Sequence, residues 1–203
     1  AEGRVGSGPA GEGVAPVERW WSALEASWPP CREGVVQTPR RVAEAMAAVA
    51  VESLPDDDSP LRVLDPACGV GGLLLAALLS VRARWPQRSV VLEGVEIDGS
   101  ALAGAQANLS EPASGCGAEL RLRVGDGLAP TEARYELVIA NPPYSRAARR
   151  DCGGRAHATP ARAGLNKREL ERRFACARGA FDLSVPFVEQ GMQLLAPRGV
   201  GVF

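Results

Sequence analysis

From Leu61 onward, short apolar runs alternate with longer stretches of helical composition, and this alternation restricts the fold more than any other feature of the chain. We expect strands at 61–64, 90–97, 120–124, 137–140 and 199–203. Helices are expected between them, at 71–84, 100–109 and 181–195. Strands that alternate with helices predict an α/β fold with a doubly wound, mostly parallel sheet.

An N-terminal helical extension is expected ahead of this sheet. A first helix at 17–28 places three large apolar side chains on one face, which we interpret as a packing surface: Trp20, Leu24 and Trp28. Thr38 and Pro39 are typical of the N-cap and the first residue of a second helix. The first residues are rich in Gly, Ala and Pro, as in a flexible tail. We therefore divide the chain into a tail, a helical segment and an α/β domain: 1–16, 17–58 and 59–203.

The composition excludes several kinds of site. The 203 residues include 5 cysteines, an odd number without C-x-x-C spacing, which favours reduced thiols in the cytoplasm over disulfides or a zinc site. A single histidine, His157, leaves little room for Ser/His, Cys/His or multi-histidine chemistry, so no metal is expected. No apolar run reaches the length of a membrane span and no secretory signal is visible, so no membrane partner is expected.

Positive charge is gathered in one segment of the chain. The whole chain has a formal net charge of -1, whereas the residues from Asn141 to Ala180 carry a net charge of +7. A nearly neutral chain with its cations in one place predicts an anionic partner that binds there.

A glycine-rich run joins the first expected strand to a leucine-rich helix. It extends from Asp65 to Gly72 and reads Asp-Pro-Ala-Cys-Gly-Val-Gly-Gly. At the carboxyl end of a parallel strand, such glycines let a ligand approach the backbone, and the Asp65 carboxylate suits an ammonium group. Leu74 stands where a dinucleotide fingerprint has its third glycine, and no Gly-Lys-Ser/Thr follows. The run therefore indicates a cofactor site of another kind.

Two further strand ends carry carboxylates. Glu96 is placed to hold a ribose diol, and Ile97 to pack on an adenine face. Asp98 is interpreted as a helix N-cap. Asp126, after the third strand, suits a hydrogen bond from an adenine amino group and equally suits a turn between two glycines.

The sequence Asn141-Pro142-Pro143-Tyr144 directly follows the fourth expected strand. The two prolines fix the backbone and provide no N–H donor. The Asn141 side-chain oxygen and the Pro142 carbonyl can accept the two hydrogens of a planar amine, while Tyr144 stacks on its ring. Such an amine is a poor nucleophile because its lone pair is delocalised, and two acceptors favour localisation of that pair in the transition state.

The glycine-rich run and the Asn-Pro-Pro-Tyr sequence together resemble the motifs of a known family. Asp65-Pro-Ala-Cys-Gly-Val-Gly-Gly72 resembles motif I of S-adenosylmethionine-dependent methyltransferases, and Asn141-Pro-Pro-Tyr144 resembles motif IV of the amino-methyltransferases. Weaker similarities follow the same order: Glu96-Ile97-Asp98 to motif II, Asp126 to motif III, and Gly34 to Pro39 to an upstream motif X. This order is that of the gamma-class adenine-N6 DNA methyltransferases. The segment from Phe181 to Glu189 is similar to the one that follows Asn-Pro-Pro-Tyr in type IIG and related restriction–modification enzymes.

The resemblance implies a Rossmann-like methyltransferase sheet and direct, in-line methyl transfer from S-adenosylmethionine to the N6 amine of an adenine flipped out of duplex DNA. One set of residues would bind the cofactor: Thr38, Asp65, Ala67, Gly69, Glu96, Ile97 and Asp126. A second set would act on the target base: Asn141, Pro142 and Tyr144. Within the first set, Glu96 would hold the ribose hydroxyls and Thr38 would close the pocket. Arginines between 146 and 178 could reach phosphates near the flipped base.

Two parts of the family pattern are not found in these residues. The family sheet continues past its fifth strand into an antiparallel hairpin, and the family has a target-recognition region. We therefore expect an incomplete core without the hairpin strands, with recognition supplied elsewhere, for example by a separate specificity chain. Activity of these residues alone is left open.

Other functions remain open at this level. The same acceptors serve a protein glutamine amide or the N2 amine of guanine in RNA, although Thr38-Pro39 and the Asp-Pro-Ala-Cys run favour DNA adenine. A truncated, non-catalytic module that binds cofactor or DNA is a second alternative, and a hydride-transfer enzyme is a distant third.

Overall fold

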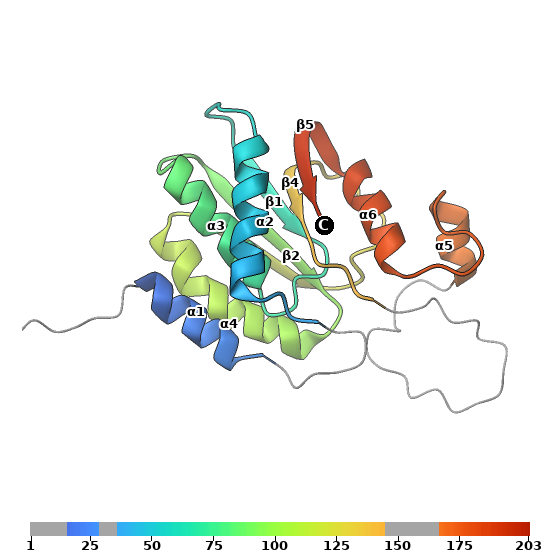
Figure 1. Ribbon diagram of the computed structural model, residues 1–203, viewed down its shortest axis with the longest axis horizontal. Helices are drawn as coiled ribbons and strands as arrows, with labels where there is room; N and C mark the ends of the chain where they lie inside the picture. The colour runs from blue at the N-terminus through green and yellow to red at the C-terminus, as the bar shows by residue number, and fades with distance from the viewer. Residues whose placement is uncertain (1–15, 29–35, 145–166) are drawn as a thin grey trace, which may run out of the picture.

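The computed structural model describes residues 16–28, 36–144 and 167–203. In these residues, five strands form one sheet in the order β3-β2-β1-β4-β5, and every neighbouring pair is parallel (Figure 1). The strands are β1 (Leu61–Asp65), β2 (Val90–Glu96), β3 (Glu119–Val124), β4 (Tyr135–Ile139) and β5 (Leu195–Val202). The expected parallel α/β sheet is confirmed, because each apolar run in the sequence corresponds to one of these strands.

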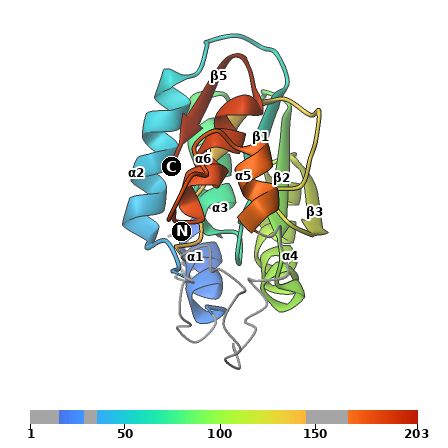
Figure 2. The same ribbon diagram turned by 90° about the vertical axis from the view of Figure 1, so that its right-hand side faces the viewer.

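Four helices pack together against one face of the sheet. They are α1 (Pro16–Ala26), α2 (Arg40–Ser53), α3 (Gly72–Arg84) and α4 (Gly99–Gly115). Their buried side chains form a single apolar cluster with those strand residues that point the same way, such as Leu61, Val63 and Leu137. Figure 2, turned by 90°, shows α2 to the left of the sheet, with α5 and α6 toward the viewer. Trp21 and Leu24 are the fully buried side chains of α1, so its tryptophan face is a packing surface.

The opposite face of the sheet is covered in a different way. Toward β5 it packs on the end of α6 (Ser184–Gln193) through a small cluster that includes Leu64, Val138 and Leu194. Toward β2 and β3 it carries charged residues instead. The Glu93 carboxylate accepts hydrogen bonds from Arg62 at 2.7 Å and from the Tyr135 hydroxyl at 2.9 Å. Burial and the neighbouring Glu93 carboxylate raise the pKa of Tyr135 to about 12.

Several boundaries differ from those expected. Pro16, assigned above to the tail, is the first residue of α1, and the rest of that tail lies outside the described residues. The last expected helix is shorter at both ends, and β5 begins at Leu195 rather than at residue 199. A short helix, α5 (Lys167–Arg173), was not expected.

Thr38 is not the N-cap of α2, contrary to our expectation. The helix starts at Arg40, its N-cap is Pro39, and no side chain caps it. The Pro39 carbonyl instead accepts hydrogen bonds from the backbone N–H groups of Val42 and Ala43. The Thr38 hydroxyl is therefore available for another contact, which is described below.

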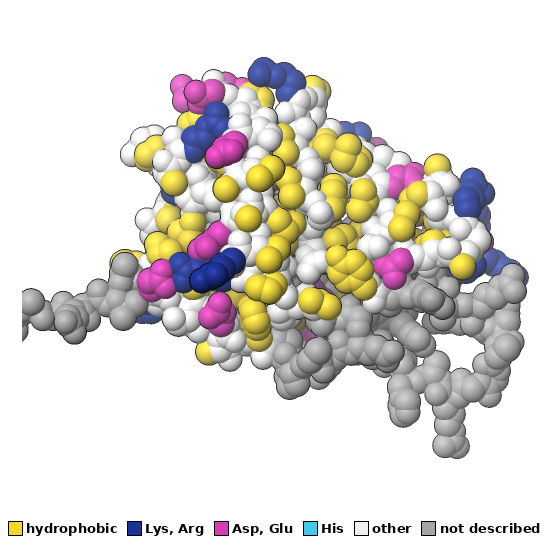
Figure 3. All heavy atoms as spheres, in the orientation of Figure 1, with side chains coloured by type: hydrophobic (Ala, Val, Ile, Leu, Met, Phe, Trp, Pro, Cys, Tyr) yellow, Lys and Arg dark blue, Asp and Glu magenta, His cyan; other side chains and the backbone are white. Residues whose placement is uncertain are grey.

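Exposed apolar side chains are concentrated on two helices. Figure 3 shows hydrophobic side chains along α2 and over α6. The most exposed of them are Val42 and Val49 on α2 and Val185, Val188 and Met192 on α6. No helix in the described part of the chain has both the length and the apolar character needed to cross a membrane.

Candidate active site

The loops that carry the expected site residues leave one edge of the sheet next to one another. β1 lies between β2 and β4, with Asp65 paired to Gly94 and Leu64 paired to Val138. β3 lies beyond β2, with Val124 paired to Glu96. All four strands are parallel, so their carboxyl ends share this edge, which is where open α/β sheets bind ligands.

The glycine loop after β1 is held in a fixed shape. Gly71 is the N-cap of α3 with a φ of 95°, and a Cβ placed on it would lie 2.8 Å from Leu109. Neither that backbone conformation nor that space suits a side chain. The Cys68 N–H donates to the Val95 carbonyl at 3.0 Å, which ties the loop to β2. The sequence run thus forms a tight turn that presents backbone N–H groups at the start of a helix.

Asp65 is buried at the root of this loop. Its side chain is 1% exposed, and its Oδ1 atom accepts a hydrogen bond from the Ala67 N–H at 3.0 Å. Burial raises the pKa of Asp65 to about 7, and the nearby Glu96 carboxylate acts in the same direction. A carboxyl held in this way gains most from a nearby positive charge, which would restore its ionised form.

Glu96 connects the glycine loop to the end of β2. One carboxylate oxygen accepts from the Gly69 N–H at 2.9 Å, and the other accepts from the Asp98 N–H at 2.9 Å. Each oxygen has two lone pairs, so both can accept a further hydrogen bond. Asp98 caps α4 by accepting from Ser100 and Ala101, which confirms the expected N-cap. Ile97 lies between them, partly buried.

Asp126 lies in the turn that follows β3, and this turn packs on the glycine loop. Its Oδ1 atom accepts from the Leu128 N–H at 2.8 Å, so the turn geometry allowed by the sequence is present. A Cβ on Gly127 would lie 1.9 Å from the Pro66 carbonyl oxygen, so only glycine fits there. The two loops are therefore in direct backbone contact.

One residue that sequence reasoning missed secures this contact. Gln190, on α6, is 6% exposed and donates to the Gly127 carbonyl at 2.7 Å and to the Ala129 carbonyl at 3.3 Å. The surrounding apolar cluster joins Ala67 of the glycine loop to α5 and α6. The available signal was a glutamine among the apolar residues of a helix, which is too common to single out from sequence.

The Asn-Pro-Pro-Tyr turn begins where β4 ends. The Ala140 N–H donates to the Val202 carbonyl of β5 at 3.0 Å, which fixes the start of the turn. Pro142 is buried, whereas Tyr144 is 51% exposed, so its ring is available for stacking. The structure therefore brings this turn to the same edge as the glycine loop.

Asn141 contacts the segment that precedes α2. Its Nδ2 atom donates to the Thr38 hydroxyl oxygen at 3.2 Å and to the Val36 carbonyl at 3.4 Å. Between these two residues, the Gln37 side-chain oxygen lies 3.6 Å from the position that a Cβ on Gly69 would occupy. Residues 36–38 thus bond to the Asn-Pro-Pro-Tyr turn and lie beside the glycine loop.

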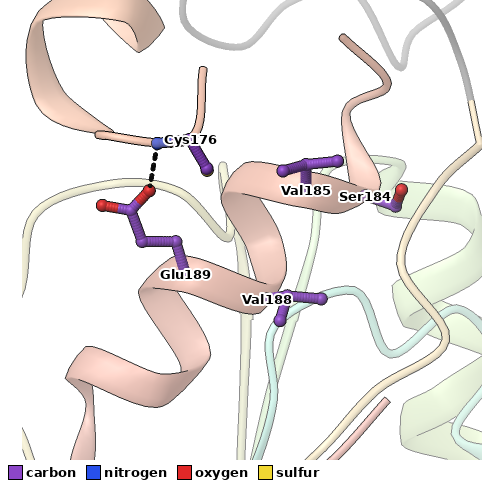
Figure 4. Close-up of a pocket in the computed structure, with 5 residues that line it drawn as sticks. All are labelled: Cys176, Ser184, Val185, Val188 and Glu189. Atoms are coloured by element: carbon purple, nitrogen blue, oxygen red, sulfur yellow. Dashed lines mark hydrogen bonds between the residues drawn. The ribbon is translucent and has the colours of Figure 1, made fainter. Parts of the chain in front are cut away.

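A hollow of about 360 Å³ lies elsewhere on the surface (Figure 4). Cys176, Ser184, Val185, Val188 and Glu189 line it, and none of them belongs to the expected site. Glu189 accepts from the Cys176 N–H at 2.8 Å, which fixes the turn after α5 on α6.

The arginine-rich segment expected to reach phosphates is described only from residue 167 onward, and there Arg168, Arg172 and Arg178 are exposed.

Two family models match parts of this chain. The family model described as N-6 DNA Methylase matches residues 26–160, and the model described as Eco57I restriction-modification methylase matches residues 119–203. Type II methyltransferase M.VspI of Vibrio sp. (strain 343) is 31% identical over 119 residues, which are 57% of this chain and 26% of that protein. Ribosomal RNA small subunit methyltransferase C of Shewanella pealeana is 40% identical over 83 residues, which are 41% of this chain and 21% of that protein.

A solved structure shows the same fold. The type I restriction-modification system methyltransferase subunit from Streptococcus thermophilus matches with a TM-score of 0.61 and 23% identity, over 90% of this chain and 36% of that one. The chain spans about a quarter of the length of the curated relatives it matches, 26% of one and 21% of another.

Proposed function

This chain belongs to the N-6 DNA Methylase family, and from that membership we propose that it transfers a methyl group from S-adenosylmethionine to the N6 amine of adenine in DNA. One observation carries the proposal. The glycine loop and the Asn141-Pro142 turn follow two hydrogen-bonded parallel strands, β1 and β4, so a methyl donor and a planar amine can meet between them.

The residues at the ends of β1, β2 and β3 fit this cofactor. When bound, S-adenosylmethionine supplies an electrophilic methyl group on a positively charged sulfur. Gly69 has a φ of 53° and no side chain of its own, its N–H donates to the Glu96 carboxylate, and the Asp65 carboxylate lies near Glu96. Glu96 would accept hydrogen bonds from the ribose hydroxyls, while Ile97 and Asp126 would contact the adenine. Asp65, Ala67 and Gly69 would hold the methionine end, and Thr38 would help to close the pocket.

The turn after β4 would act on the target base. Asn141 Oδ1 and the Pro142 carbonyl would each accept one N6 hydrogen, which favours a pyramidal nitrogen with a localised lone pair. Tyr144 would stack on the adenine ring. The nitrogen would form a bond to the methyl carbon while the sulfur–methyl bond breaks and its electron pair stays on sulfur. The nitrogen would then lose one proton to solvent, so no general-base histidine is needed.

Duplex DNA with an adenine-containing site is the proposed partner. The exposed arginines Arg168, Arg172 and Arg178 lie on or just after α5 and would contact phosphates. Recognition of the target sequence would be supplied elsewhere, for example by a separate specificity chain. The three free cysteines described, Cys68, Cys116 and Cys176, support a cytoplasmic location, where both DNA and cofactor occur.

RNA is the second candidate substrate, because the chain is also similar to a ribosomal RNA methyltransferase. Labelled cofactor offered in parallel with adenine-containing duplex DNA, an adenine-free duplex, ribosomal RNA and a glutamine-containing protein separates these functions. We expect label only in the first substrate, and as N6-methyladenine. Label in RNA would move the function to guanine or adenine in RNA, and cofactor binding without transfer to any substrate would favour a non-catalytic module.

A further inference from the structure

The segment from Val36 to Thr38 contacts the side chain of the residue that is proposed to act on the target amine. Asn141 Nδ2 donates to Thr38 Oγ1 at 3.2 Å and to the Val36 carbonyl at 3.4 Å. These partners are more than a hundred residues apart in sequence, since the separations are 105 and 103. The contact is therefore a product of the tertiary fold and not of the local turn.

The Val36 carbonyl decides which end of the Asn141 amide faces the segment. A carbonyl can only accept, so the NH₂ group must lie on its side, and Oδ1 must lie on the other side of the amide. The outer torsion of an asparagine is otherwise broad and roughly two-fold, so an unrestrained side chain samples both orientations. In the reversed orientation, NH₂ would replace Oδ1, and two donors would face each other at the target amine.

The Thr38 hydroxyl can take part because α2 does not use it. That helix has Pro39 as N-cap and no side-chain cap. The hydroxyl oxygen accepts from Asn141, and its hydrogen remains able to donate to another group. Thr38 can thus orient Asn141 and still face the cofactor pocket.

We infer that Thr38, together with the Val36 carbonyl, positions Asn141 by holding its NH₂ group, so that Oδ1 is presented to the target amine. This inference rests on the proposed function for its effect on the rate, but the orientation itself can be measured without any substrate. It assigns Thr38 to the amine side of the site in addition to the cofactor side.

The kinetic test uses two substitutions of one residue. Thr38→Val keeps the shape of the side chain and removes the hydroxyl, whereas Thr38→Ser keeps the hydroxyl. With cofactor and DNA both saturating, we expect Thr38→Val to lower kcat by about tenfold, the effect of losing one good hydrogen bond. Thr38→Ser should recover most of that loss. The control is Thr131→Val, an exposed threonine in the loop before β4, which should keep the wild-type kcat.

A second readout separates this inference from the proposed function. In the 203-residue chain, the side-chain N–H resonances of Asn141 are identified by their loss in Asn141→Asp. Thr38→Val should shift them, while Thr38→Ser and Thr131→Val should leave them in place. Unshifted resonances, or a Thr38→Val enzyme whose kcat is normal once cofactor is saturating, would overturn the inference. A wild-type protein that methylates no DNA, with the shift still present, would overturn the proposed function alone.

Discussion

Asn141 is the residue on which the proposed chemistry depends most directly. Its side chain lies in a turn fixed by two prolines and by the Ala140 contact with β5, and its NH₂ group is already bonded within the protein. Little reorganisation is left for the moment of reaction, which is the condition under which a hydrogen-bond acceptor contributes most to rate.

Replacing Asn141 with alanine should abolish methyl transfer and leave cofactor affinity nearly unchanged. The reason is that Asn141 is proposed to contact the target amine, whereas the loops after β1, β2 and β3 are proposed to hold the cofactor. Transfer of labelled methyl and titration calorimetry with S-adenosylmethionine measure the two effects. Gln106→Ala, on the exposed side of α4, is the matched control. A normal transfer rate in the Asn141 variant would contradict the mechanism.

Glu96 is proposed both to hold the glycine loop and to bind the cofactor, and its replacement should first lower the affinity for the cofactor. Its carboxylate holds the Gly69 N–H and is proposed to hold the ribose hydroxyls. We expect Glu96→Ala to raise the cofactor Kd by at least about tenfold, since a charge-assisted hydrogen bond is removed. Calorimetric titration measures it, with Glu132→Ala on an exposed loop as control. An unchanged Kd would show that the ribose assignment is wrong.

Asp65 should make stability depend on pH in a defined direction. Its pKa is raised from 3.8 to about 7 on folding, so the folded state favours the protonated form. The free energy of unfolding therefore falls as pH rises from about 4 to about 7, and this contribution is constant above that range. Asp65→Asn keeps the acceptor for the Ala67 N–H and carries no charge.

Urea unfolding at pH 5 and pH 8 tests this expectation. The stability advantage of the Asp65→Asn protein over the wild type should be larger at pH 8 than at pH 5 by up to about 3 kcal/mol, because about two pH units separate pH 5 from the folded pKa of Asp65. Taking the difference between the two proteins cancels the titration of all other groups. A difference that is the same at both pH values would show that Asp65 is ionised in the folded protein.

At the scale of elements, α6 acts as a support for the loop after β3. Gln190 satisfies two carbonyls of that loop from a buried position, and Phe187 packs on Gly127. The loop itself carries Asp126. The proposed adenine contact thus depends on a helix that lies more than sixty residues later in the chain, as the separation of 63 between Gln190 and Gly127 shows.

Gln190→Leu should destabilise the protein by about 1–3 kcal/mol, the cost of leaving buried carbonyls without a donor. Hydrogen exchange should rise first in residues 125–134. Gln193→Leu is the control, because Gln193 lies on the same helix, is exposed, and donates a hydrogen bond to Glu189 rather than to the loop after β3. Equal stability of the two variants would mean that water replaces the missing donor at no cost.

The sequence predicted the elements better than the contacts between them. Each of the five strands corresponds to an expected apolar run, because burial on a parallel sheet selects such runs directly. The expected N-cap at Thr38 was wrong, because the local preference of threonine gave way to a tertiary hydrogen bond with Asn141. Gln190 could not be found, since nothing near it in the sequence marks the carbonyls that it serves. Helix α5 begins at the edge of the described residues and has too few apolar positions to show a period.

The candidate site shows the same division. The glycine loop and the Asn-Pro-Pro-Tyr turn are contiguous in sequence, so they were visible as motifs. Their adjacency follows from the pairing of β1 with β4, which the alternation of strands and helices suggests but does not fix. The roles given to the individual residues stay predictions until binding is measured.

In the molecule as a whole, apolar burial and charge are distributed unevenly over the two faces of the sheet. Four helices bury one face of the sheet, while part of the other face is lined by the ion pairs of Arg62 and Arg121 with Glu93. The exposed arginines on and after α5 lie in the segment that carries the excess positive charge. A DNA duplex is the kind of partner that such a segment attracts.

Replacing these arginines with glutamine should weaken DNA binding at all sequences and make it less sensitive to salt. The residues are Arg168, Arg172 and Arg178. For every phosphate that an arginine no longer neutralises, the slope of log K against log salt should fall by about one unit. Titrations at several salt concentrations measure the slope, and the control removes equal charge elsewhere, at Arg19, Arg84 and Arg134. An unchanged slope would assign the α5 arginines to solvent.

The hydrogen bond between Ala140 and Val202 also bears on how the protein forms during synthesis. When the ribosome has made the Asn-Pro-Pro-Tyr turn, the strand that anchors it has not yet been translated. The turn must therefore wait, unanchored, until α6 and β5 emerge, and a nascent chain stalled before that point carries the motif without the geometry. The Asn-Pro-Pro-Tyr turn consequently reaches its final geometry late in synthesis, however fast the earlier strands pair.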